Sequence, residues 1–320
     1  MLKIHGSFIV FFIAASFSNV AADRGMLPII PGISVYEPGQ KAIIAWSGSK
    51  EILILSTDVY ADESTKVLEV LPLPSKPVVK EGNFKSFEVV QKIIESHRPP
   101  YSLISGDAKA NRTAHPPGMA ILFYKKVGAH SITCVDAADW DSFTAFLKTF
   151  VEKEGITTVK FPEGFSDLIE KYIKNRFNFF ILDVVEVGKE KNSIEPIVYS
   201  FKTPYLYFPL EISSIVPGET NIDLFLLSKH KLNLQDTGTG LVQGLYYGYN
   251  YHPEPEKPVE DKTVQKVNEE TSNIIQLELT PRQQRKISKD IDRLFWGNVY
   301  LSTLRYHGET DGLRNDLLLK

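Results

Sequence analysis

His130, Cys134 and Asp136 are the first residues whose types and spacing could do chemistry. If residues 130–136 are extended, alternate side chains lie on the same face, so these three would share it. An imidazole, a thiolate and a carboxylate are all ligands of zinc. Their spacing matches no established zinc-ligand pattern, however, and acidic residues at the start of a helix are stabilised by the helix dipole without any metal. The sequence therefore marks these residues as candidate metal ligands but predicts no bound metal ion and no cofactor.

A run of tyrosines near residue 250 suggests a second kind of site, a flat surface for binding. Tyr247, Tyr249 and Tyr251 would present three rings on one side of an extended segment. Aromatic rings that carry hydroxyl groups can stack on sugars or on another protein and still form hydrogen bonds. The alternative is an edge strand whose rings cover the core. The first interpretation predicts that an unidentified protein or carbohydrate of the cell envelope binds this face.

The sequence contains no motif of the common enzyme classes that we considered. It has neither the G-x-S-x-G elbow of a serine hydrolase nor the H-E-x-x-H motif of a zinc protease. The glycine-rich segment 238–244 lacks the preceding strand and following helix of a phosphate-binding loop. We therefore expect a non-catalytic binding or interaction protein. The alternative is a secreted hydrolase whose acid-base residues are dispersed along the chain, among them Asp58, His115, His130 and Asp136.

The first 22 residues have the features of a secretory signal peptide. Lys3 precedes an apolar run from Phe8 to Phe17, and small residues follow at 20–22. The apolar run is shorter than the roughly 20 residues that a membrane-spanning helix needs. We expect cleavage after Ala22 and an extracytoplasmic protein, periplasmic or secreted, with no membrane span after cleavage.

The composition is typical of a globular protein that is stabilised by packing. The 320 residues include 36 basic and 39 acidic side chains, so the net charge is close to zero. A nucleic-acid-binding domain would be basic, so we expect no nucleic-acid partner. Cys134 is the only cysteine, which excludes an internal disulfide. The hydrophobic core must therefore supply the stability.

Hydrophobic periodicity predicts the elements that position these residues. Short apolar or alternating runs predict strands at 42–46, 52–55, 67–71, 120–124, 130–135, 177–187, 197–201, 222–227, 299–304 and 317–319. Apolar residues spaced three and four apart predict amphipathic helices at 83–97, 143–151, 165–173 and 280–295. The pattern indicates an α+β fold of mixed, largely antiparallel sheets with three or four amphipathic helices packed on them.

Local signals add detail to this prediction. Residues 47–49 have the composition of a hairpin turn between the first two strands. The prolines of segment 72–77 lack an N–H, so we expect this segment to leave the sheet. Residues 197–201 alternate between apolar and more polar side chains, which predicts a half-exposed strand. Thr280 is expected to cap the last helix.

Changes in composition suggest the domain organisation. We expect the signal peptide at 1–22, a sheet-rich N-terminal half with one helix at 23–128, and an α+β half at 129–252. A Pro/Glu/Lys linker at 253–262 could not bury enough apolar surface to fold alone. The remaining segment, 263–320, is predicted to form a helix and strands that return to the main body.

Several short segments together resemble a known family. They are Pro-Leu-Pro-Ser-Lys-Pro at 72–77, Ala-Asp-Trp-Asp at 138–141, Lys171-Tyr172-Ile173, the segment 207–213, Leu304-Arg305 and Asn315-Asp316-Leu317. In this order they resemble the exported prokaryotic proteins of domain-of-unknown-function family twenty-three thirty. The resemblance covers most of the mature chain and implies export and a shared fold. It implies no activity and no catalytic residues, and the cysteines that many relatives carry near the mature N-terminus are missing at 24–28.

Overall fold

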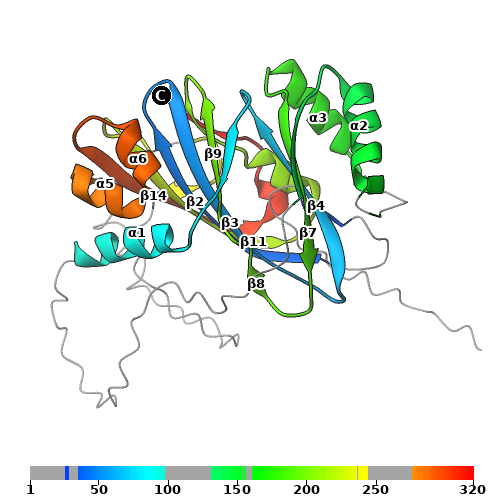
Figure 1. Ribbon diagram of the computed structural model, residues 1–320, viewed down its shortest axis with the longest axis horizontal. Helices are drawn as coiled ribbons and strands as arrows, with labels where there is room; N and C mark the ends of the chain where they lie inside the picture. The colour runs from blue at the N-terminus through cyan, green and yellow to red at the C-terminus, as the bar shows by residue number, and fades with distance from the viewer. Residues whose placement is uncertain are drawn as a thin grey trace, which may run out of the picture.

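The computed structural model describes residues 26–28, 35–97, 131–153, 155, 161–235, 237–243 and 276–320. Over these residues the protein has an α+β fold of mixed, largely antiparallel sheets with helices packed on them, which confirms the predicted fold class (Figure 1). The predicted signal peptide, the strand at 120–124 and the linker at 253–262 lie outside the described residues.

The larger sheet has nine strands, in the order β12-β14-β11-β2-β3-β9-β5, with β13 paired to β14 and β8 paired to β3. Their bounds are β2 (Val35–Trp46), β3 (Lys50–Ala61), β5 (Val78–Glu81), β8 (Asn192–Ser193), β9 (Ile197–Lys202), β11 (Glu219–Ser228), β12 (Val242–Gln243), β13 (Leu277–Leu279) and β14 (Val299–Glu309). β2 and β3 form the hairpin predicted around residues 47–49. β11 pairs in parallel with β2 and antiparallel with β14, so segments far apart in the sequence share this sheet.

A four-stranded sheet lies beside it, in the order β1-β4-β7-β6. Its strands are β1 (Met26–Pro28), β4 (Thr65–Leu73), β6 (Ser131–Asp136) and β7 (Phe179–Val187). A separate antiparallel pair consists of β10 (Leu206–Phe208) and β15 (Leu317–Leu319). The helices are α1 (Lys85–Ser96), α2 (Trp140–Lys153), α3 (Phe165–Lys174), α5 (Pro281–Ile287) and α6 (Lys289–Leu294), with short 3-10 turns η1 (Glu211–Ile215) and η2 (Thr310–Gly312).

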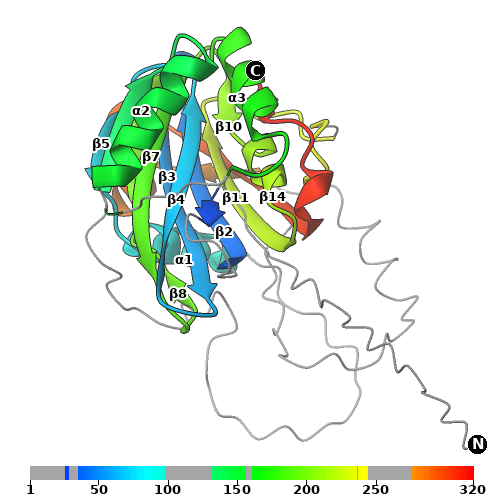
Figure 2. The same cartoon turned by 90° about the vertical axis from the view of Figure 1, so that its right-hand side faces the viewer.

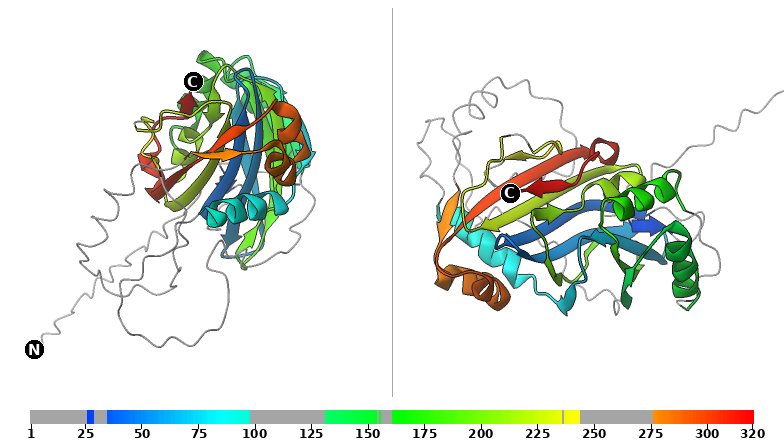
Figure 3. Two further views of the ribbon diagram at one scale, coloured as in Figure 1. Left: turned by 90° about the vertical axis from the view of Figure 1, so that its left-hand side faces the viewer. Right: turned by 90° about the horizontal axis from the view of Figure 1, so that it is seen from above.

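The two sheets and the helices form layers. α2 and α3 cover the outer face of the four-stranded sheet through buried residues such as Phe143 and Ile169 (Figure 2). α1, α5 and α6 cover the outer face of the larger sheet through Phe87 and Ile291 (Figure 3). The largest apolar cluster joins the inner faces of both sheets with β10 and β15. Each central strand therefore buries both of its faces, which is why apolar residues dominate the strand sequences.

The prediction that segment 72–77 leaves the sheet is wrong for its first two residues. Pro72 and Leu73 continue β4 and pair with β7. The carbonyl of Pro72 accepts a hydrogen bond from the hydroxyl of Tyr207 (3.1 Å) and so points away from β7. In a strand the N and C=O of one residue point to the same side, so the missing N–H of Pro72 interrupts no pairing with β7.

β9 is buried on both faces, whereas the alternation at 197–201 predicted a half-exposed strand. Val198 packs in the cluster beneath α1, α5 and α6, and Tyr199 packs between the sheets. The polar neighbour Ser200 is only partly exposed. Alternation failed here because helices cover the face that the pattern assigned to solvent.

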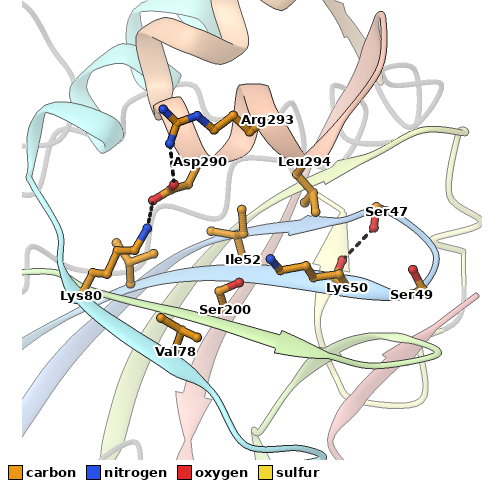
Figure 4. A pocket seen from close by; sticks show the side chains of 11 residues that line it. Ser47, Ser49, Lys50, Ile52, Val78, Lys80, Ser200, Asp290, Arg293 and Leu294 are labelled. Carbon is orange, nitrogen blue, oxygen red and sulfur yellow. Dashed lines mark hydrogen bonds and ion pairs between the residues drawn. The ribbon is translucent and has the colours of Figure 1, made fainter.

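The single helix predicted for 280–295 is divided at Ser288. α5 begins with the predicted cap, in which the Thr280 hydroxyl accepts from the Gln283 amide and the Gln283 side chain accepts from the Thr280 amide. Ser288 is extended and its hydroxyl accepts from the amide of Asp290 (3.2 Å), which starts α6. After this break, Asp290 and Arg293 of α6 lie over strands of the larger sheet (Figure 4).

Candidate functional site

A pocket of about 460 Å³ lies on the outer face of the larger sheet, between α6 and strands β3, β5 and β9 (Figure 4). Its floor is apolar and consists of Ile52, Val78 and Val198, with Leu294 of α6 facing them. Val78 is 60% exposed, although large apolar side chains are usually covered. The pocket therefore leaves the Val78 side chain accessible to a ligand, whereas Ile52 and Val198 are almost fully buried.

Three cationic side chains and one carboxylate surround this floor. Lys80 Nζ lies 3.0 Å from Asp290 Oδ2, and Arg293 Nη1 lies 3.8 Å from Asp290 Oδ1. Lys50 stands on the hairpin, apart from this pair of contacts (Figure 4). The side chains of Lys80 and Arg293 keep 54% and 75% of their surface exposed. Positive charge thus exceeds negative charge around the pocket, and the cations remain accessible.

The hairpin turn places Lys50 and two hydroxyl groups at one end of the pocket. The backbone N–H and the hydroxyl of Ser47 both donate to the carbonyl of Lys50, at 3.0 and 3.2 Å. Gly48 has a φ of +98°, which a residue with a side chain rarely adopts. Ser49 and, from β9, Ser200 complete the hydroxyl lining.

This combination of groups suits a small organic anion. Ammonium and guanidinium groups form charge-assisted hydrogen bonds with carboxylate and phosphate oxygens. Hydroxyl groups can donate to the same oxygens. An apolar floor beside them favours a ligand that also carries a hydrocarbon part, because small-molecule sites combine apolar walls with a few placed polar groups.

A second polar cluster, the carboxyl network, lies where α3, η1, β10 and β15 meet. It contains Asp316, Tyr172, Tyr207, Glu211 and Glu51. Asp316 Oδ1 accepts hydrogen bonds from the Tyr172 hydroxyl and the Glu211 amide, both at 2.9 Å, and Asp316 Oδ2 lies 3.2 Å from the Tyr207 hydroxyl. Lys171 forms an ion pair with Glu211 at the exposed side of this cluster.

Glu51 extends the carboxyl network into the space between the sheets. Its Oε2 accepts a hydrogen bond from the amide of Tyr207 (2.7 Å). Glu51 is fully buried, and its Oε1 has no hydrogen-bond partner among the described residues. Burial raises the pKa of Glu51 well above its usual range, against the lowering effect of the Tyr207 amide. Burial therefore favours the protonated form of Glu51 over the ionised form.

Burial also raises the pKa of the Asp316 carboxyl, to about 6, although the Glu211 amide and the two tyrosine hydroxyls oppose the shift. For Tyr172 and Tyr207, burial and then the charge of Asp316 raise the pKa well above the usual value. Both phenols therefore keep their protons and act as hydrogen-bond donors. The carboxyl network has perturbed acids, but none of its members lines the pocket.

The structure describes two of the three candidate metal ligands. Cys134 is partly buried in β6, and burial is the main cause that raises the pKa of its thiol. Asp136 is exposed and accepts a hydrogen bond from the Asn178 side-chain amide (2.5 Å). No group of three or more His, Cys, Asp or Glu side chains with the geometry of a metal site occurs in the described ranges. His130 lies outside them, so the metal hypothesis stays a prediction.

The other candidates are only partly described. Asp58 accepts a hydrogen bond from the Ser193 hydroxyl (2.5 Å) and lies 3.6 Å from Lys191 Nζ. His115 and the tyrosine face of Tyr247, Tyr249 and Tyr251 lie outside the described residues. The dispersed hydrolase and the aromatic ligand face therefore remain untested predictions.

The sequence reading missed both the pocket and the carboxyl network. The pocket residues come from the β2–β3 hairpin and four separate elements, and none of them belongs to a recognisable sequence motif. Four of the network residues, Tyr172, Tyr207, Glu211 and Asp316, lie in segments of the family resemblance, whereas Glu51 lies in none of them. In the structure four of these segments come together, through contacts of Pro72, Tyr172, Tyr207, Glu211 and Asp316.

Comparisons with known proteins give one result. A family model described as "Uncharacterized protein conserved in bacteria (DUF2330)" matches residues 21–275. No curated protein and no solved structure matches the chain. In the part of the chain that the structure describes, no helix is both long enough and apolar enough to cross a membrane. Because the family model spans most of the sequence, this chain belongs to the DUF2330 family, as the resemblance predicted.

Proposed function

We propose that this protein is exported and binds a small organic anion in the pocket beneath α6. The ligand class is a carboxylate or phosphate attached to a short hydrocarbon part. The observation that carries this proposal is the grouping of Lys50, Lys80 and Arg293 around the exposed side chain of Val78. The signal-peptide features of residues 1–22 support the proposed location outside the cytoplasm.

Charge and solvent access support binding in this pocket over catalysis at the same place. The pocket is lined by three cations, three serine hydroxyls and one carboxylate, Asp290, which already contacts Lys80 and Arg293. Exposed cations can instead exchange their water and their contacts with Asp290 for an incoming anion.

Titration calorimetry on the purified protein tests the proposal. The probes are hexanoate and hexyl phosphate, with hexanol as the uncharged control. We expect both anions to bind and hexanol to bind at least tenfold more weakly, because it lacks the group that the cations recognise. Equal affinity for hexanol and the anions would contradict an anion site, and so would no measurable binding of either anion.

A matched pair of charge reversals tests the location. Arg293→Glu changes a pocket cation, whereas Arg282→Glu makes the same charge change on the exposed surface of α5, outside the pocket. We expect Arg293→Glu to weaken anion binding at least tenfold and Arg282→Glu to leave it within about twofold, since exposed charges at a distance are screened by salt. An equal loss in both variants would place the ligand elsewhere.

Export has its own test, the N-terminal sequence of the protein recovered outside the cytoplasm. We expect it to start at Asp23. Intact protein confined to the cytoplasm would contradict the proposed location without affecting the proposed binding site.

A further inference from the structure

The hydroxyl group of Tyr207 lies between two acceptors. It is 3.1 Å from the carbonyl oxygen of Pro72 and 3.2 Å from Asp316 Oδ2. A phenol has one proton and can donate one full hydrogen bond at a time. If Asp316 is ionised, Tyr207 can satisfy the carboxylate or the carbonyl, but not both.

A proton on Asp316 Oδ2 resolves this competition. The carboxylic acid then donates to the Tyr207 oxygen, and the Tyr207 hydroxyl donates to the Pro72 carbonyl. Asp316 Oδ1 can accept from the Tyr172 hydroxyl and the Glu211 amide in either state. In the protonated form, every donor and acceptor in this chain of contacts has a hydrogen-bond partner. In the ionised form, either the Pro72 carbonyl or Asp316 Oδ2 lacks a donor.

Asp316 directly precedes the last strand, β15, so the change in its hydrogen bonds between the two protonation states affects how that strand is held. The next residues form β15, whose only pairing in the described structure is its three-residue ladder with β10. Residues Leu317 and Leu319 are buried in the core between the sheets, whereas Leu318 is 45% exposed. Such a short strand depends on its anchor, and Asp316 supplies contacts to α3, η1 and β10 together.

We propose that Asp316 is a proton-dependent latch that holds β15 against the body of the protein. When the carboxyl group is protonated, the latch is fully hydrogen-bonded and the strand stays closed. When the carboxyl group is ionised, the segment around β15 opens more often. The latch requires no ligand in the pocket, so it is independent of the proposed function.

The charged and titratable groups around Asp316 agree with this direction. Tyr172 and Tyr207 stay protonated, and Glu211, on η1, carries a negative charge that opposes ionisation of Asp316. Lys171, from α3, forms an ion pair with Glu211. The carboxyl group of Glu51 accepts a hydrogen bond from the amide of Tyr207. Burial, with a smaller contribution from the charge of Glu211, raises the pKa of Asp316 from 3.8 to about 6, although the Glu211 amide and the two tyrosine hydroxyls lower it.

The sign of the pH effect follows from this shift. An opened segment returns Asp316 to water, where its ordinary pKa of 3.8 applies. A raised pKa in the closed form means that closure is most stable at low pH and loses stability as the pH rises through about 6. Between about pH 5 and about pH 7.5, linkage with these two pKa values predicts about a tenfold increase in the opening equilibrium.

Amide hydrogen exchange of Leu317, Leu318 and Leu319 measures this opening, after correction for the intrinsic pH dependence of exchange. We expect protection of these amides to fall by about tenfold from about pH 5 to about pH 7.5. Protection in the hairpin β2–β3 serves as the internal reference. Unchanged protection of β15 across this range would overturn the proposal, and this test needs no variant.

Three substitutions assign the effect to Asp316. Asp316→Asn cannot ionise, so we expect its protection to be independent of pH. Asp311→Asn removes the same charge from an exposed residue five positions earlier, and Glu51→Gln removes the other buried carboxyl group. Both should keep the tenfold dependence. A pH dependence that survives in Asp316→Asn, or that disappears in either control, would contradict the assignment.

Discussion

The pocket and the carboxyl network lie on opposite faces of the same strand. Lys50 and Ile52 of β3 line the pocket on the outer face of the larger sheet, whereas Glu51, between them in sequence, joins the carboxyl network on the inner face. This is the alternation expected of a strand. Neighbouring residues of one strand therefore belong to two different environments, the pocket on the outer face and the buried carboxyl network on the inner face.

The difference between the two regions lies in their access to water. The carboxylate of Asp290 shares its contacts with two cations that are more than half exposed, so water screens their attraction and an anion can replace it. Asp316 has three donors in a largely desolvated setting, where burial raises its pKa. Exposed charges are available to a ligand, whereas buried charges govern stability and its dependence on pH.

The largest effect is expected for Tyr207, which forms hydrogen bonds with both Asp316 and Glu51. Tyr207→Ala removes a fully buried ring from the core and should lower the free energy of unfolding by about 3–5 kcal/mol. Tyr207→Phe keeps the ring and should cost about 1–2 kcal/mol, through the lost hydroxyl contacts. Urea denaturation measures both. Equal costs for the two variants would mean that packing of this ring contributes nothing.

The next effect concerns Asp316 and its dependence on pH. Asp316→Ala leaves the Tyr172 hydroxyl and the Glu211 amide without their acceptor, and near pH 5 it should destabilise the protein by about 1–3 kcal/mol. The cost should be about 1 kcal/mol smaller near pH 7.5, because the raised pKa of Asp316 makes the ionised side chain less favourable in the folded protein. Urea unfolding at both pH values measures this, and a cost that increases with pH would contradict it.

Asp290 provides the contrasting carboxylate. Asp290→Asn should change the free energy of unfolding by less than about 1 kcal/mol, because its ion pairs are exposed. The same change removes the anion that competes for Lys80 and Arg293, so the affinity for hexanoate should rise by about two- to fivefold. A stability loss as large as that of Asp316→Ala would remove the distinction between the two regions.

The elements were largely predictable because each has its own local signal. The i, i+3, i+7 spacing of Phe87, Val90 and Ile94 predicted α1, and the Thr280–Gln283 capping box predicted the start of α5. The errors at Pro72 and in β9 arose where tertiary neighbours, a tyrosine hydroxyl and a layer of helices, replaced the partners that local rules assume.

The two sites were not predictable in the same way. The pocket requires Lys50, Lys80 and Arg293 to converge, and the contact of Lys80 with Asp290 spans 210 positions in the sequence. The contact between Tyr172 and Asp316 spans 144 positions. Spacing along the chain contains no information about such contacts, because they depend on strand order and on the break at Ser288 that orients α6.

Anion binding by two adjacent variants on β3 tests the separation of these regions most directly. Lys50→Glu reverses a charge at the pocket, whereas Glu51→Gln removes the ionisable group from the buried side chain on the other face. In titrations with hexanoate we predict at least a tenfold loss of affinity for Lys50→Glu and a change of less than about twofold for Glu51→Gln. Equal losses in the two variants, or full affinity in Lys50→Glu, would contradict an anion site on the outer face that is separate from the buried carboxyl network.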